Sequence, residues 1–133
     1  KNDAYYIHSA IQASGKYDGI LYLNENVNSE NAKDDIVDFI EKINGDVGEI
    51  LFYFSGHGAY IDEDFKYVLS DYRPDRINQT TLSNNTLDNY FRQLNSKVVV
   101  KCIDACQSGT TYVKDPSVVE KYLQGNLNKH YVF

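Results

Sequence analysis

KVVVKCIDACQSGT, residues 97–110, reads as an apolar β-strand that stops abruptly in a polar segment containing a cysteine. Consecutive β-branched residues are typical of a strand inside a sheet. Small and polar residues then surround Cys106, whereas Cys102 lies four positions earlier within the apolar run. We therefore expect Cys102 in the core, and the Cys106 sulfur where solvent or a substrate can reach it.

A second informative run is EILFYFSGHG, residues 49–58. Its first six residues show no polar alternation after the glutamate, which predicts a strand covered on both faces, as in a parallel sheet. His57 follows directly, between two glycines, where the backbone can approach a ligand closely. A histidine in this position is poorly suited to a purely structural role in the core.

The rest of the chain alternates helical and strand patterns. Helices are predicted from apolar spacing and capping residues, and strands from short β-rich runs. The predicted order is a helix ending at Gly15, a strand at 19–23, a helix starting at Asn28 or Ser29 and ending before Gly45, the strand at 49–54, a strand or hairpin arm at 65–70, a loop at 71–85, a helix starting at Ser83 or Asn84, and the strand at 97–103. This order predicts an α/β fold with a mostly parallel sheet, right-handed crossovers and helices on both faces.

Length and charge limit the classes of protein to consider. The 133 residues make one domain, residues 1–133, and the net charge of −6 argues against a direct nucleic-acid partner. No apolar run approaches the roughly 20 residues that a bilayer crossing needs, and no signal peptide opens the chain. Two cysteines do not make a disulfide framework, so we expect a reducing, cytoplasmic setting and no membrane partner.

The two ends of the sequence predict that the domain is incomplete. The chain begins directly on a helix, with no strand for it to follow. It ends on KHYVF, residues 129–133, an apolar and β-rich run with nothing after it to cover it. We expect a missing partner segment at both ends; the alternative is a frayed terminal strand in a complete small domain.

His57 and Cys106 each follow a predicted strand. In open α/β sheets the ligand crevice lies outside the carboxyl ends of the strands, so neighbouring strands would bring the imidazole and the thiol together. An adjacent imidazolium lowers a thiol pKa, the thiolate attacks a carbonyl, and the imidazolium returns a proton to the leaving amine. The backbone N–H groups of Gly58 and Cys106 are the candidate oxyanion donors.

Asp104 precedes Cys106 by two residues, so in an extended strand both point to the same side. A carboxylate beside the thiol would line the substrate pocket and select a basic side chain.

Less specific explanations exist for the same residues. His57 alone could be a turn histidine, and Cys106 alone an inert small residue. Cys102, Cys106 and His57 do not have the spacing of a zinc knuckle and lack a fourth ligand. The acidic residues 62–64 lack the spacing of a calcium loop, and a solvated turn explains them better. The sequence predicts no metal site and no cofactor.

Together, ILFYFSGHG and VVVKCIDACQSG resemble the His and Cys motifs of the caspase-like cysteine peptidases, particularly metacaspases and bacterial caspase-like proteins. His57 and Cys106 lie 49 positions apart (106 − 57), against about 50 in caspases. The resemblance implies a caspase fold, a His57–Cys106 dyad and an oxyanion hole formed by the Gly58 and Cys106 N–H groups. Caspases carry Gln at the position of Asp104; metacaspases carry Asp, which implies cleavage after Arg or Lys.

The resemblance also implies what the chain lacks and how it is used. The family's first strand and its small-subunit half, with the second acidic wall of the pocket, would lie outside this sequence, so the chain corresponds to the large-subunit part. Implied partners are a protein or peptide substrate, the small-subunit-like segment and other domains of a longer parent. Lys114 and Lys121 are implied processing sites, calcium activation stays open, and signalling or defence proteolysis is the implied role.

Two other functions remain open at this point. A catalytically silent caspase-like module could act as an interaction scaffold, although an intact His–Cys pair with both flanking glycines argues against it. An unrelated flavodoxin-like binding domain is disfavoured because the sequence contains no phosphate loop.

Overall fold

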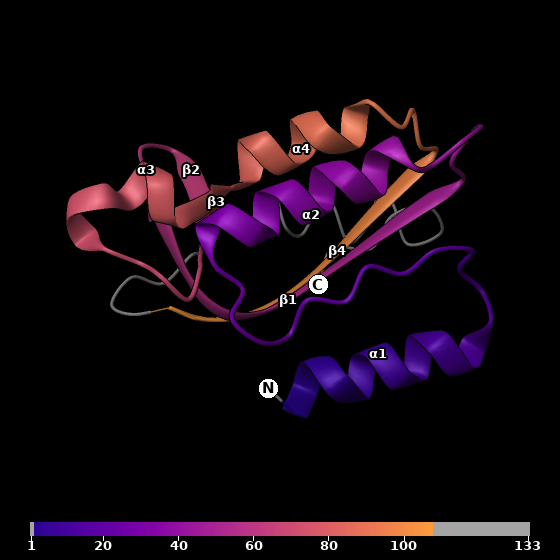
Figure 1. Cartoon of the computed structure of the whole chain (residues 1–133), viewed down its shortest axis with the longest axis horizontal. Helices are drawn as coiled ribbons and strands as arrows, with labels where there is room; N and C mark the ends of the chain where they lie inside the picture. Colours follow the sequence, from indigo (N-terminus) through magenta and orange to yellow (C-terminus); the bar gives the residue numbers. More distant parts are fainter. Residues whose placement is uncertain (1, 108–133) are drawn as a thin grey trace, which may run out of the picture.

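A computed structural model describes residues 2–107 of the chain. Helices lie on both faces of one sheet, with α2 and α4 on one face and α1 on the other, as Figure 1 shows. The predicted α/β class with helices on both faces is thereby confirmed. The elements are α1 (Asn2–Ser14), α2 (Ser29–Glu41), β1 (Glu49–Ile61), β2 (Asp64–Val68), η1 (Pro74–Arg76), α3 (Ile77–Thr80), β3 (Thr81–Ser83), α4 (Asn84–Arg92) and β4 (Val98–Gln107).

The sheet has the order β3-β2-β1-β4 and is mixed. Its longest pairing is the parallel one between β1 and β4, which runs from Glu49 opposite Val98 to Gly58 opposite Gln107. The shorter pairings of β2 with β1 and with β3 are antiparallel. The predicted parallel arrangement therefore holds for the two strands that carry His57 and Cys106.

A two-residue turn joins β1 to β2. Asp62 and Glu63 both have positive φ, 53° and 61°, as the tight hairpin turns that match strand twist require. Both are exposed, so the predicted solvated turn is confirmed. The third acidic residue, Asp64, is instead buried at the start of β2, where its carboxylate accepts from the Ser83 hydroxyl and the Asn85 amide.

Side-chain caps define where the helices begin. The Asn28 side chain accepts from the Asn31 amide at 2.9 Å at the start of α2, and Ser83 accepts from the Thr86 amide at 3.4 Å at the start of α4. These oxygens satisfy amides that the first helical turn leaves unpaired, which confirms both predicted starts. Gly45, at φ +87°, follows α2 in a conformation that other residues adopt with strain.

The core lies between the sheet and the helices α2 and α4. Tyr67 and Leu87 are completely buried there. The Tyr67 ring meets three others edge-on, with centroids 4.9–5.3 Å apart; they are Phe52, Phe54 and Phe65. Ala32 of α2 and Leu87 of α4 pack in the same cluster, so both predicted amphipathic helices turn their apolar side toward this face.

Two predictions about local structure were wrong. Residues 19–23, predicted as a strand, form none, because a strand requires a neighbour and this segment pairs with no described strand; Ile20 and Leu21 are left partly exposed. The stretch 71–85, predicted as a loop, contains η1, α3 and β3. The Thr80 hydroxyl accepts a hydrogen bond from the Arg73 amide and donates one to the Arg76 carbonyl, which stabilises the turns of this stretch. Such contacts produce no apolar periodicity, so the sequence pattern did not reveal them.

Burial of the two central strands is also less complete than predicted. All of residues 49–55 are half-buried, rather than covered on both faces, and Cys102 is likewise half-buried rather than a core residue. The reason is that α1 covers its face of the sheet only in part. Its Tyr5 and Tyr6 side chains remain exposed.

Candidate active site

His57 lies inside β1 rather than after its end, which corrects the sequence prediction. The strand continues to Ile61 because it changes partner at Gly58. Up to Gly58 it pairs with β4, and from Gly58 onward it pairs with β2. His57 therefore belongs to the next-to-last residue pair of the parallel ladder, although it does not lie at the end of its own strand.

The register brings His57 and Cys106 together at the level of the main chain. They are Cα partners in the parallel ladder, and Ser55 is the partner of Asp104. Adjacent strands lie about 4.8 Å apart, so the two backbones are neighbours despite their separation in sequence. The main chain of β4 is described as far as Gln107, just beyond Cys106.

The two faces of the β1–β4 pair carry different residues, because side chains alternate along each strand. The α2–α4 face carries Phe52, Phe54, Lys101 and Ile103, and the α1 face carries Tyr53, Ser55, His57, Cys102 and Asp104. His57 and Asp104 are both exposed. Among the side chains of residues 4–105, neither has a hydrogen-bond or ion-pair partner. Both groups are therefore accessible to a ligand on the α1 face.

Gly58, the candidate oxyanion donor, is buried between β2 and β4 and has Cα partners on both strands, Tyr67 and Gln107. The Phe65 ring packs directly against it: a Cβ at this position would stand 2.2 Å from Phe65 Cζ. No side chain fits there unless the ring moves. The close packing of the Phe65 ring therefore explains why the residue after His57 is a glycine.

Cys102 is the second thiol of β4, and it lies in a less polar environment than a reactive thiol requires. Burial raises its pKa above the ordinary value, which disfavours the thiolate form. Because the thiolate is the nucleophile, Cys102 is a poor candidate for chemistry at neutral pH. This agrees with its sequence-based interpretation as a non-catalytic residue, although it is less buried than predicted.

Sequence reasoning missed Lys101. Its ammonium donates to Asn84 Oδ1 at 2.9 Å and forms an ion pair with Asp88. The Tyr67 hydroxyl donates to the same Asn84 oxygen at 2.9 Å. The sequence did contain a signal for this contact: a single lysine within an apolar strand is tolerated only if its charge is paired or reaches solvent.

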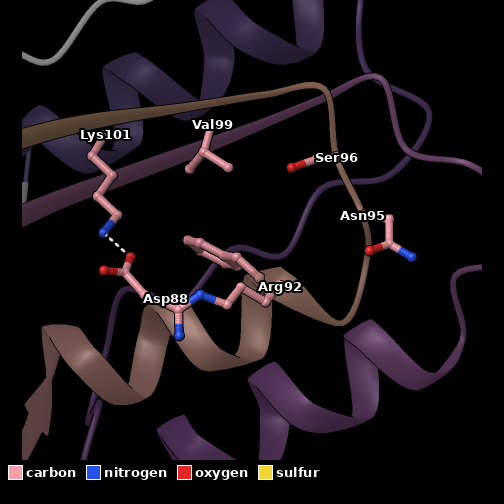
Figure 2. Close-up of a pocket in the computed structure, with 7 residues that line it drawn as sticks. Asp88, Arg92, Asn95, Ser96, Val99 and Lys101 are labelled. Carbon is pink, nitrogen blue, oxygen red and sulfur yellow. Dashed lines mark hydrogen bonds and ion pairs between the residues drawn. The ribbon is translucent and has the colours of Figure 1, made fainter.

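A groove of about 490 Å³ lies between α4 and the first half of β4. Figure 2 shows Lys101 and Val99 on one side and Asp88 and Arg92 on the other, with the Lys101–Asp88 ion pair across it. This groove is on the α2–α4 face. His57 and Asp104 lie on the opposite face, so the groove is not part of the candidate active site.

Metal and membrane features can be stated for the described residues only. Among residues 2–107, no three or more His, Cys, Asp or Glu side chains are grouped as metal ligands would be. No helix in this range has both the length and the apolar character to span a bilayer. Lys114, Lys121 and the terminal run at 129–133 lie outside the described residues.

The structure defines an α/β protein with a histidine and a cysteine at partner positions of two parallel strands. A family model for the caspase domain matches residues 1–130, and the chain belongs to this family of cysteine peptidases. No curated protein gives a significant match to the chain.

Proposed function

We propose that this protein is a cysteine endopeptidase that uses a His57–Cys106 dyad and cleaves after a basic residue. The observation that supports the proposal most directly is the register of the β1–β4 ladder, in which these two residues are partners. Membership of the caspase-domain family supports the same chemistry independently of the register.

Each step of the proposed reaction uses a group with a defined role. The Cys106 thiolate attacks the carbonyl carbon of the scissile peptide, and the electron pair of the C=O bond moves to oxygen. Collapse of this intermediate breaks the C–N bond, and the His57 imidazolium gives its proton to the leaving amine. Water, deprotonated by His57, then hydrolyses the thioester and regenerates the thiol.

The negative oxygen formed in this reaction requires hydrogen-bond donors, and we assign the Cys106 and Gly58 N–H groups. One such donor is typically worth about 3–4 kcal/mol in the transition state. Gly58 is the residue that follows His57 and is paired in register with Gln107, the residue that follows Cys106, so the two proposed donors belong to adjacent positions of neighbouring strands.

Asp104 supplies the proposed preference for Arg or Lys before the cut. Its carboxylate is exposed, on the α1 face with His57, and has no hydrogen-bond or ion-pair partner among the side chains of residues 4–105. A guanidinium could therefore meet it bidentately in a charge-assisted contact. Aspartate at this position is also the feature that makes the chain resemble metacaspases more than caspases.

The proposed setting follows from the same resemblance. We place the activity in the cytoplasm, in regulated signalling or defence proteolysis, with a small-subunit-like segment completing the pocket. Lys114 and Lys121 are proposed processing sites for a basic-selective enzyme. No cofactor is needed for the proposed chemistry, and calcium activation is a separate question.

A cleavage screen tests this function. The protein is incubated with a peptide library, and the cut sites are mapped by mass spectrometry for wild type, Cys106→Ala and the matched control Cys102→Ala. We expect cuts after Arg or Lys with wild type and Cys102→Ala, and none with Cys106→Ala. Failure of wild-type protein to cut any peptide, together with no labelling of Cys106 by thiol-reactive substrate analogues, would favour a non-catalytic scaffold.

A further inference from the structure

Lys101 interrupts an otherwise apolar stretch of β4, and its side chain is only 15% exposed. Its ammonium donates to the side-chain amide oxygen of Asn84, Oδ1, and to the carboxylate of Asp88, both on α4. A charge withdrawn this far from water is tolerated only where it is paired and hydrogen-bonded. Lys101 must therefore lie opposite Asn84 and Asp88, which constrains the position of β4 relative to α4.

Tyr67 joins the same hydrogen-bonding group from β2. Its hydroxyl donates to Asn84 Oδ1, the oxygen that also accepts from Lys101. Its ring is fully buried and contacts Phe52 and Phe54 of β1 edge-on. The Lys101 cluster, defined as Lys101, Asp88, Asn84 and Tyr67, therefore connects β4 through α4 to β2, and through the Tyr67 ring to β1.

The apolar residues of these strands do not fix the register by themselves. Residues 98–100 are three valines, and residues 50–54 are all aliphatic or aromatic. A slip of β4 by two residues keeps every side chain on its own face, and at the start of the strand it replaces one valine by another, Val98 by Val100. The same slip moves position 101 by about 6.6 Å along the strand, away from Asp88 and Asn84.

We propose that the Lys101 cluster sets the register of β4 and thereby holds Cys106 as the partner of His57. Lys101 is on the opposite face of the sheet from His57, so it acts as a positioning residue and takes no part in the chemistry. Buried polar groups have this role in other folds, where one such residue selects a register that apolar packing leaves open. The consequence for catalysis rests on the proposed peptidase function; the consequence for register does not.

The first test compares Lys101→Met with Lys97→Met in the whole protein. Lys97 is the matched control, because it lies just before β4 and is exposed. Amide hydrogen exchange reports the ladder directly, and steady-state kinetics report its effect on cleavage. In Lys101→Met we expect exchange at 104–107 to accelerate about tenfold or more relative to β2. We also expect kcat to fall on the order of a hundredfold, with KM nearly unchanged. Lys97→Met should change neither.

A double variant separates positioning from a general loss of stability. Lys101→Met alone leaves the Asp88 carboxylate without its cation, which destabilises the protein for a reason unrelated to register. Adding Asp88→Asn removes that charge, so resistance to urea should recover. If the cluster sets the register, kcat stays low in the double variant. Recovery of kcat together with stability would overturn the proposal, as would equal acceleration of exchange at all slow amides.

Hydrogen exchange also distinguishes failure of this inference from failure of the proposed function. If wild-type protein cleaves nothing, yet Lys101→Met selectively loosens residues 104–107, the positioning role stands and the peptidase function falls. If Lys101→Met cleaves peptides as fast as wild type and β4 stays protected, the positioning role is wrong and the peptidase function stands.

Discussion

The two faces of the β1–β4 pair treat polar side chains in opposite ways. On the α2–α4 face, Lys101 is nearly buried and bonded to Asn84 and Asp88. On the α1 face, His57 and Asp104 are exposed, and neither is hydrogen-bonded or ion-paired to a side chain of residues 4–105. Paired polar groups fix geometry, whereas accessible ones can bind and react. One face of the same two strands therefore carries a bonded polar cluster, and the other carries exposed residues that we propose for catalysis and substrate binding.

Aromatic residues show the same contrast. Tyr67 is completely buried among three phenylalanine rings on the α2–α4 face. On the other side of the sheet, Tyr5 and Tyr6 of α1 remain 58% and 67% exposed. Burial of apolar area is the main favourable contribution to folding, so most of the stability should come from the α2–α4 face. Substitutions on the two faces should therefore affect different measurements.

The largest expected effect is on catalysis. Cys106→Ala removes the proposed nucleophile, so the rate of peptide cleavage should fall on the order of 10⁴-fold or more, with little loss of stability. The measurement is cleavage of an Arg-containing fluorogenic peptide, alongside labelling by a thiol-reactive substrate analogue.

Cys102→Ala is the control for this substitution, because it removes the other thiol from the same strand. It should retain cleavage and labelling. Labelling that persists in Cys106→Ala and disappears in Cys102→Ala would reverse the assignment of the two cysteines.

The largest stability effect should come from the α2–α4 face. Leu87 is completely buried, and Leu87→Ala should lower the free energy of unfolding by about 2–5 kcal/mol through lost burial and a new cavity. Leu21→Ala makes the same chemical change at a 37% exposed side chain outside the core cluster, and should cost less than about 1 kcal/mol. Urea unfolding measures both; equal losses would contradict the placement of the core around Leu87.

A smaller effect is expected on selectivity. Asp104→Asn keeps the shape of the side chain and removes its charge, so cleavage after Arg should slow roughly tenfold to a hundredfold relative to cleavage after Leu. Labelling of Cys106 should be preserved, because the dyad is untouched. The ratio of kcat/KM for matched Arg and Leu peptides is the measurement. A wild-type preference for neutral or acidic residues would remove the pocket argument and leave the dyad in place.

The smallest effect concerns the contact between the segment after α1 and the start of β1. The Tyr17 hydroxyl donates to Glu49 Oε2 at 2.7 Å, and with Lys16 it holds the pKa of Glu49 below its ordinary value. Glu49 therefore contributes stability fully above its unfolded pKa of about 4.3, and loses it as pH falls through the lower folded value.

Tyr17→Phe should accordingly lower the free energy of unfolding by about 1 kcal/mol at pH 7, because Glu49 is only partly shielded from water. The difference between variant and wild type should shrink as the pH falls below about 4. Urea unfolding at pH 7 and pH 3 measures it. A difference that is the same at both pH values would show that Glu49 ionisation is not involved.

Local signals in the sequence predicted the helices well. Asn28 and Ser83 are capping residues placed before amphipathic repeats, and both cap the helices expected of them. The β1 and β4 strands were predicted because long apolar β-rich runs have few other uses in a soluble domain. The motif positions His57 and Cys106 followed from the residues around them, and the structure pairs their backbones.

Errors arose where the outcome depends on contacts between distant segments. Residues 19–23 have the composition of a strand and no described strand beside them, whereas β3, three residues long, forms because β2 offers it an edge. The SGHG stretch (55–58) was predicted to follow a strand because glycines are typical of the segments after strands. It belongs to β1 because β2 takes over the pairing at Gly58.

By itself the sequence determined the α/β class, the starts of α2 and α4 and the two positions at which chemistry is proposed, because capping, periodicity and motif spacing are local properties of the chain. Only the tertiary structure decided which residues stand opposite one another. Three consecutive valines begin β4, and in our proposal its register depends on where Asn84 and Asp88 of α4 meet Lys101. That contact joins residues more than ten positions apart, so no local pattern could have revealed it.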